Sequence, residues 1–152
     1  MSPSPTDRIE RHVVVRAPRS RVWRALSDPT ELGTWFGVKL PPAAFKPGDR
    51  VVGAITHPGY EHVKLDITIE RMEPETLLSW RWHPHAVEKG VDYSKEPTTL
   101  VVFQLEEVAD GTKITVTESG FDQVPAARRA LAFRMNGEGW TIQIQAIARH
   151  VA

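Results

Sequence analysis

The sequence predicts an α+β fold in which one antiparallel sheet of six or seven strands carries a long C-terminal helix on its apolar face. Three observations lead to this prediction. Short runs with two-residue hydrophobic alternation fill the middle of the chain, two short helical segments follow the first strand, and a helical stripe of apolar residues occupies the C-terminal part. Because neither this stripe nor the apolar face of the sheet is stable in water, the two are expected to pack together.

Composition excludes several classes of function. The 152 residues have the length of one domain, taken here as residues 1–152 with a flexible lead-in over 1–7. Lysine and arginine total 19 against 19 acidic residues, so there is no basic footprint for nucleic acid or an anionic membrane surface. No cysteine offers a disulfide or a thiolate, and no apolar run is long enough to span a membrane. We therefore expect a cytoplasmic protein that has neither nucleic acid nor membrane as a partner.

The chain opens with a strand and a helix. Residues 8–16 are rich in valine and isoleucine and place their apolar side chains mainly on one face, which predicts a strand. Pro18 suits the start of a helix, and residues 18–26 then gather their apolar side chains on one helical face.

A second and very short helix is predicted over residues 28–36. Asp28, with the glutamate three positions later, forms a capping box, and Gly37 is a stop signal after about two turns. So short a helix is not stable alone. It ends in the large rings of Trp35 and Phe36, which must cover either a core or a ligand.

Five further strands are predicted in the centre of the chain. The clearest alternation runs from Val63 to Ile69, where every second side chain is apolar and those between are polar. Turn signals between most of the strands favour antiparallel neighbours. The five segments are residues 50–57, 61–71, 76–82, 99–108 and 112–119.

Two links between these strands differ in character. Asp110-Gly111 is a strong signal for a tight hairpin turn. Residues 83–98 are instead polar, contain prolines and are long for a hairpin link. We expect residues 84–97 to be the most mobile internal segment.

The C-terminal segment carries two conflicting patterns. Residues 140–147 alternate as a strand would, but the apolar residues from Phe133 to Val151 recur at spacings of four and three. We predict one long helix over about residues 124–150, bent or loosened at the glycines of the NGEG segment.

Four blocks in this order resemble one protein family: VVVRAPRSRVWRALSDPTELGTWFG, LLSWRW, TVTESGF and GEGW. They are similar to the signature blocks of the START/polyketide-cyclase superfamily, also written SRPBCC, in the branch named for the activator of heat-shock-protein ATPase. The resemblance extends from about residue 8 to residue 150. It implies the helix-grip fold, in which a curved sheet wraps around the long C-terminal helix and leaves an internal cavity.

The resemblance also implies a function. Members of the superfamily bind lipids, hormones, polyketides or other apolar molecules, so we expect a single-domain protein that binds a small hydrophobic molecule in its cavity, without a cofactor or metal. One alternative is an enzyme of the cyclase, aromatase or hydrolase kind that uses Glu118. A second is a protein-interaction or stress-related module like a co-chaperone. A homodimer or another protein partner is compatible with these hypotheses.

Glu118 is the most informative polar residue. Its strand directs it to the same face as Ile114 and Val116, in a place before SGF where many relatives carry histidine. Burial of a carboxylate is costly unless it is paired, hydrogen-bonded or protonated. Arg11, itself on an apolar strand face, is one possible partner. The carboxylate is thus either satisfied structurally or available as a polar anchor for a ligand.

The predicted ligand-contacting residues are mostly large apolar side chains of the inner face. They are Trp35, Phe36, Trp80, Trp82, Phe103, Glu118, Phe133, Gly137, Trp140 and Ile144. Ordinary core packing explains rings of this size equally well, so that alternative stays open for each of them. The histidines show no recognisable metal-ligand spacing, and no catalytic residue or motif is predicted.

Overall fold

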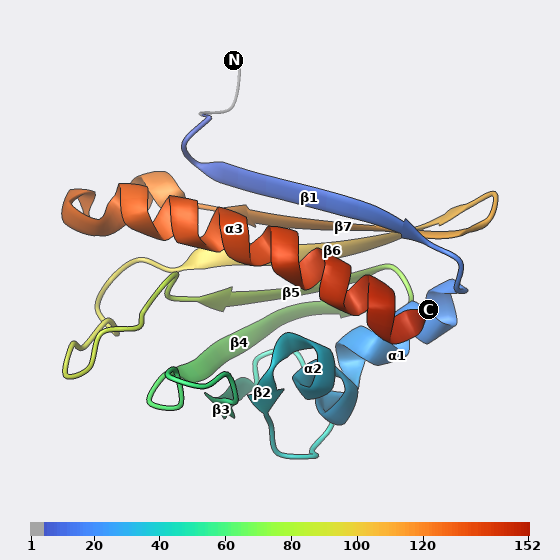
Figure 1. The fold of residues 1–152 in the computed structure, drawn as a ribbon, viewed down its shortest axis with the longest axis horizontal. Helices are drawn as coiled ribbons and strands as arrows, with labels where there is room; N and C mark the ends of the chain where they lie inside the picture. The colour runs from blue at the N-terminus through green and yellow to red at the C-terminus, as the bar shows by residue number, and fades with distance from the viewer. Residues whose placement is uncertain (1–4) are drawn as a thin grey trace.

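A curved antiparallel sheet wraps around one long helix in the computed structural model, which describes residues 5–152 (Figure 1). The strands are β1 (Arg8–Val15), β2 (Val38–Lys39), β3 (Arg50–Ile55), β4 (Lys64–Glu73), β5 (Leu77–Trp82), β6 (Thr99–Val108) and β7 (Gly111–Ser119). The helices are α1 (Arg19–Ser27), α2 (Pro29–Phe36) and α3 (Ala126–Val151), with a 3₁₀ turn η1 (Phe121–Gln123) before the last. The spatial order β1-β7-β6-β5-β4-β3-β2 gives seven strands, and the predicted α+β helix-grip fold is confirmed.

The long C-terminal helix is confirmed as well. α3 runs without a break through the glycines of the NGEG segment and crosses the inner face of the sheet (Figure 1). Ile144 and Ile147 are buried, whereas Ile142 is 65% exposed. Helical periodicity, and not the local alternation, therefore decides which isoleucines face the core.

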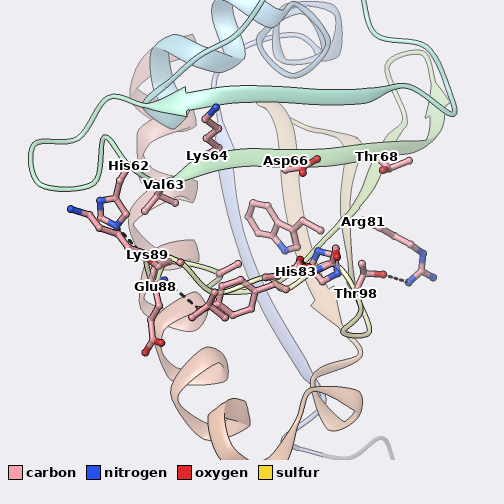
Figure 2. Close-up of a pocket in the computed structure, with 18 of the residues that line it drawn as sticks. His62, Val63, Lys64, Asp66, Thr68, Arg81, His83, Glu88, Lys89 and Thr98 are labelled. Atoms are coloured by element: carbon pink, nitrogen blue, oxygen red, sulfur yellow. Dashed lines mark hydrogen bonds between the residues drawn. The ribbon is translucent and has the colours of Figure 1, made fainter.

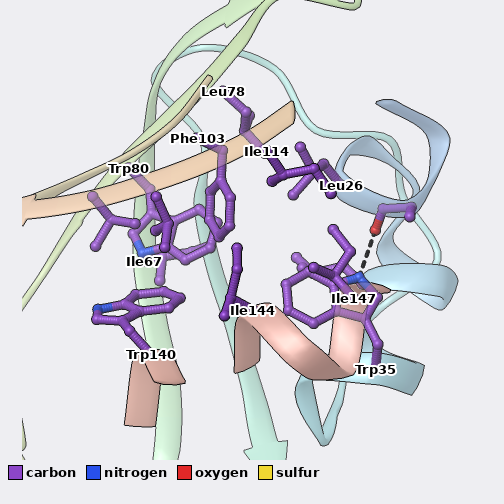
Figure 3. Packing of buried hydrophobic residues seen from close by; sticks show 14 of the residues in the cluster. Leu26, Trp35, Ile67, Leu78, Trp80, Phe103, Ile114, Trp140, Ile144 and Ile147 are labelled. Carbon is purple, nitrogen blue, oxygen red and sulfur yellow. Dashed lines mark hydrogen bonds between the residues drawn. The ribbon is translucent and has the colours of Figure 1, made fainter. Parts of the chain in front are cut away.

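The core lies between α3, α1 and the inner face of the sheet (Figure 3). On β4 the alternation is as predicted: Leu65, Ile67 and Ile69 are buried, and the residues between them are exposed. The buried rings of Trp80 and Phe103 come from the next two strands. The part of the core nearest α2 is therefore mainly aromatic.

The short helix α2 begins and ends where its sequence predicts, but the capping box is not completed, because the Asp28 N–H donates to the Arg24 carbonyl and not to the Glu31 side chain. The Asp28 carboxylate accepts hydrogen bonds from the backbone N–H groups of Thr30 at 2.9 Å and Glu31 at 3.4 Å. Gly37 ends the helix in the left-handed conformation at φ 87°, which glycine adopts without steric cost.

A charged cluster attaches α2 to the other two helices. The Glu31 carboxylate contacts Arg21 at 2.6 Å, Arg24 at 3.0 Å and the His150 ring at 2.9 Å. Burial alone would raise the pKa of Glu31, but the hydrogen bonds with His150 and Arg21 and the charges of both arginines lower it below its usual value. The cluster fixes the orientation of α2, and with it the positions of the two rings at its end.

Two local features differ from the sequence prediction. Val38 and Lys39 form the short edge strand β2, which the proline-rich segment that follows gave no reason to expect. The hairpin turn consists of residues 109 and 110, because Gly111 already pairs with Val108. Gly111 has φ 152°, and a Cβ there would overlap the Val15 carbonyl group, so only glycine lets β7 pass the end of β1.

The N-terminal lead-in is described only in part. Residues 1–4 of the segment expected to be flexible lie outside the described residues. The Asp7 carboxylate accepts hydrogen bonds from the backbone N–H groups of Gly120 at 3.3 Å and Asp122 at 3.0 Å. These bonds connect the start of β1 to the turn before α3.

Candidate ligand-binding site

Five aromatic side chains from four elements meet between α3 and the sheet, and we call them the aromatic cluster. They are Phe36, Trp80, Trp82, Phe103 and Trp140. Trp82 and Trp140 are stacked with ring centroids 5.8 Å apart and planes 30° apart. Phe36 lies 6.2 Å from each of them. These are favourable offset or edge-on arrangements, so the cluster contributes stability beyond the burial of its area.

The Glu118 carboxylate lies behind this cluster and is 0% exposed. Its Oε2 accepts hydrogen bonds from the Trp82 indole at 2.7 Å and the Thr99 hydroxyl at 2.5 Å. Its Oε1 accepts from the Trp140 indole at 2.8 Å, and the Asn136 amide reaches both oxygens at 2.9 and 3.1 Å. The carboxylate is therefore satisfied by four neutral donors.

Arg11 is not the partner of Glu118. Its guanidinium donates to the Thr141 hydroxyl at 3.0 Å and to the carbonyl oxygens of Gly137 at 3.3 Å and Glu10 at 2.8 Å. These contacts lie on the side of α3 that faces β1. No salt bridge to Glu118 occurs among the residues that the structure describes.

One indole of the cluster has no hydrogen bond. The Trp80 Nε1–H is buried and finds no partner atom within residues 5–152. The Trp82 ring lies edge-on to it, with centroids 5.7 Å apart and planes 66° apart, and its π-face is at best a weak acceptor. A buried donor without a full partner costs about 1–3 kcal/mol, so this part of the core is not optimised for stability.

A notch of about 120 Å³ opens from the surface onto the cluster beside α3. Its walls are the rings of Phe36, Trp82 and Trp140, together with side chains on one side of α3. The α3 residues are Met135, Asn136, Gly139 and Gln143. The notch lies between α3 and the sheet, where the helix-grip fold predicts a cavity, and the aromatic cluster packs beside it.

The two rings that end α2 have different surroundings. Trp35 is buried, donates its indole N–H to the Ala25 carbonyl at 2.8 Å (Figure 3), and packs edge-on to Phe103 with centroids 6.3 Å apart. Phe36 is only partly buried and forms a wall of the notch. Trp35 thus joins α2 to α1, whereas Phe36 faces a space that a ligand could enter.

The other predicted ligand-contacting residues lie away from the notch. Ile144 is buried in the core, and Phe133 packs edge-on to Phe121 with centroids 5.3 Å apart. A Cβ at Gly137 would lie 3.4 Å from Arg11, so this glycine gives room to the arginine. Gly139 behaves differently, because nothing lies within 4 Å of a Cβ built there.

A larger groove of about 750 Å³ lies where β4 separates from β5. β5 pairs with β4 only from Thr68 onward, so Lys64–Ile67 have partners on β3 alone in the described sheet. Figure 2 shows Asp66 and Thr68 on β4 and His83 across the groove. A hydrogen bond from Arg50 lowers the pKa of Asp66. Trp82 lines both the groove and the notch, and its ring is a wall that the two share.

The loop of residues 83–98 borders this groove and is attached to α3 through Arg128. The guanidinium donates to Glu96 at 2.8 Å and to the Pro84 carbonyl at 2.7 Å, and it lies 4.8 Å from the centroid of the Tyr93 ring. The expected mobility of residues 84–97 stays a prediction, and these contacts identify what would restrain it.

Residues 5–152 contain neither a metal-binding cluster nor a membrane-spanning helix. No group of three or more histidine, cysteine or acidic side chains is arranged to hold a metal ion there. None of their helices combines the length and hydropathy needed to cross a membrane.

Comparison of the sequence with protein families gives a match to the family described as Activator of Hsp90 ATPase homolog 1-like protein, over residues 16–152. The chain belongs to this family. The superfamily resemblance of its sequence blocks is thereby confirmed, and the matched region includes every residue of the aromatic cluster. A search of curated proteins gave no significant match.

Several solved structures share the fold of this chain. DynU16, a protein of the dynemicin biosynthetic locus, is 27% identical with a TM-score of 0.71 over 97% of this chain, which spans 47% of the DynU16 chain. A protein from Nitrosomonas europaea is 18% identical with a TM-score of 0.73, covering 99% of this chain and 97% of its own. One from Arthrobacter aurescens is also 18% identical, with a TM-score of 0.75 and coverage of 99% and 89%. The last two similarities concern the fold alone.

Sequence reasoning missed several residues at the candidate site of this family member. Asn136 lies one helical turn before Trp140, so the i, i+4 spacing could have placed both on one face. Thr99 pairs with Trp82 across β5 and β6, but that register depends on the length of the loop between them. Gln143 donates to the Phe36 carbonyl at 2.9 Å. The two residues are 107 positions apart, so no local sequence pattern predicts this contact.

Proposed function

We propose that the protein binds a small hydrophobic molecule in the notch formed by Phe36, Trp82 and Trp140. The observation that carries the proposal is an open notch with three aromatic walls and vacant space beside Gly139. Apolar walls with a few polar groups are typical of small-molecule sites. A volume of about 120 Å³ suits a single ring or a branched alkyl group, since an apolar cavity of roughly 150 Å³ is known to take benzene.

A larger ligand would need the notch to widen. Phe36 is only partly buried and its ring makes no hydrogen bond, so it can move outward at lower cost than the fully buried Trp80. Trp82 is also only partly buried, but its outward movement would break the 2.7 Å hydrogen bond to Glu118. Movement of Trp82 would open the notch toward the groove between β4 and β5, because the ring lines both. The proposal therefore includes binding by displacement of the Phe36 ring.

The geometry favours binding over catalysis by Glu118. A general acid or base must come within hydrogen-bond reach of the proton it transfers. The Glu118 carboxylate is fully buried, and both of its oxygens already accept hydrogen bonds from side chains that separate it from the notch. A binding site needs no such access.

The experiment that tests the proposal uses the indole N–H resonances of the chain. Toluene, cyclohexanol and decanoic acid would be titrated into ¹⁵N-labelled protein. We expect at least one of them to bind with micromolar affinity and to shift the signals of Trp82 and Trp140. The Trp35 signal, whose N–H is bonded to the Ala25 carbonyl, should move least. Failure of every probe to shift the two signals would remove the proposal.

Gly139→Leu provides the matching variant. Its side chain enters open space in the notch, and leucine is a better helix former than glycine by up to about 1 kcal/mol, so the variant should fold and lose binding. Gln145→Leu adds the same side chain at an exposed position of α3 and should bind as the wild type does.

A further inference from the structure

The side-chain groups at the notch that stay available for hydrogen bonds with a ligand are mainly acceptors. The indole N–H groups of Trp82 and Trp140 are used on Glu118 at 2.7 and 2.8 Å, and so is the Asn136 amide N–H₂. The Gln143 amide N–H₂ donates to the Phe36 carbonyl at 2.9 Å. The side-chain carbonyl oxygens of Asn136 and Gln143 have no hydrogen-bond partner in the described part of the chain. The notch therefore offers a ligand two carbonyl acceptors, and both of its indole N–H donors are occupied.

The carboxylate behind the notch accepts hydrogen bonds at both oxygens, as an ionised carboxylate does, and it forms no salt bridge within residues 5–152. Glu118 is one side chain away from the notch, because three of its four donors form the walls. Those donors are neutral, so they solvate the carboxylate without cancelling its charge. The Arg11 guanidinium is bonded to Gly137 and Thr141, about a third of a turn around α3 from the notch residues.

The walls themselves favour positive charge. The faces of tryptophan and phenylalanine rings carry partial negative charge and attract cations, with the largest effect for tryptophan. Two indoles and one phenyl ring enclose the notch, and Glu118 accepts hydrogen bonds at the N–H edges of both indoles. Those bonds to an anion draw positive charge toward the indole nitrogens and leave the ring faces more negative.

We propose that the molecule bound in the notch is a small organic cation: an ammonium group that carries alkyl substituents. The alkyl groups would contact the ring faces, any N–H of the ammonium would donate to the oxygens of Asn136 and Gln143, and the positive charge would lie in the field of Glu118. The inference rests on the proposed function, since it names the class of ligand for the same notch. The volume of about 120 Å³ limits the enclosed part to a group of roughly trimethylammonium size.

The test compares two probes of the same shape. Choline and 3,3-dimethylbutan-1-ol differ only in having a positively charged nitrogen or a neutral carbon at the branch point. Affinities are measured from the Trp82 and Trp140 indole resonances and from calorimetry at low ionic strength. We expect choline to bind at least tenfold more tightly than the alcohol, which corresponds to about 1.4 kcal/mol.

Two variants separate the effect of Glu118 from a change in net charge. Glu118→Gln should reduce the ratio of the two affinities to less than about threefold, because the charge behind the rings is removed. Glu138→Gln removes the same charge from an exposed position of α3 and should keep the wild-type ratio. Circular dichroism establishes that each variant is folded. If Glu118→Gln does not fold, the ratio of the choline and alcohol affinities of the wild type alone tests the cation inference.

The outcomes distinguish this inference from the proposed function. Equal affinities of the wild type for both probes would overturn the cation inference and leave binding of small hydrophobic molecules in place. Binding of toluene without binding of choline would do the same. If neither of these two probes nor any of toluene, cyclohexanol and decanoic acid shifts the two indole signals, the proposed function itself fails, and the inference fails with it.

Discussion

The Thr99 hydroxyl provides a clean test of how Glu118 is held. Thr99 is 0% exposed and donates to Oε2 of the carboxylate at 2.5 Å. Thr99→Val removes the donor while nearly keeping the shape of the side chain. A hydrogen bond to a charged group is worth about 1.5–3 kcal/mol, and we expect the free energy of unfolding to fall by about that amount.

Thr112→Val is the matched control. Thr112 is also 0% exposed, but its hydroxyl donates to a neutral acceptor, the Ala17 carbonyl, at 2.7 Å. Such a bond is worth about 0.5–1.5 kcal/mol, so the two variants should differ by roughly 1–1.5 kcal/mol. For a chain of this length the difference amounts to roughly 2–6 °C in Tm.

The assay is equilibrium unfolding in urea, followed by circular dichroism, for the wild type and both variants. Equal losses of stability in the two variants would show that Glu118 gains no more from its donor than a neutral carbonyl does. The description of Glu118 as a charged acceptor held by neutral donors would then be wrong. The field argument for a cationic ligand would also lose its basis.

Three further predictions concern the frame of the site. The pKa of Glu31 in the folded chain lies below its ordinary value of 4.5, so the unfolded chain binds the proton more readily. The stability that this cluster contributes is therefore complete above pH 4.5 and is lost as the pH falls through the folded pKa. Urea unfolding from about pH 3 to 7 should show this loss in the wild type and a flatter dependence in Glu31→Gln. Arg128→Ala should speed amide hydrogen exchange in residues 84–97 by at least about tenfold without affecting β4; unchanged exchange would show that Arg128 does not restrain the loop. Gly111→Ala should cost more than about 2 kcal/mol of unfolding free energy because its Cβ overlaps the end of β1, whereas Gly139→Ala should stabilise the chain; similar effects at both glycines would contradict this.

Local patterns were sufficient for most of the secondary structure. Asp28, as the N-cap, set the start of α2, and Gly37 set its end. On β7, the two-residue period placed Glu118 among buried neighbours before any contact was known. Such features depend on neighbours a few positions apart in the chain, so they can be read from the sequence. The isoleucines of residues 140–147 needed the longer stripe of α3 to decide between the two periods.

The partners of Glu118 and the size of the notch were decided only by the tertiary structure. The sequence placed Arg11 and Glu118 both on apolar strand faces, but the carboxylate bonds with Thr99 and Asn136, which are 19 and 18 positions away and come from β6 and α3. Which donor reaches it depends on strand register and on how α3 lies across the sheet. The space left for a ligand depends in turn on how rings from α2, β5 and α3 pack together. A local sequence pattern cannot predict the volume of that space, because the rings come from distant parts of the chain.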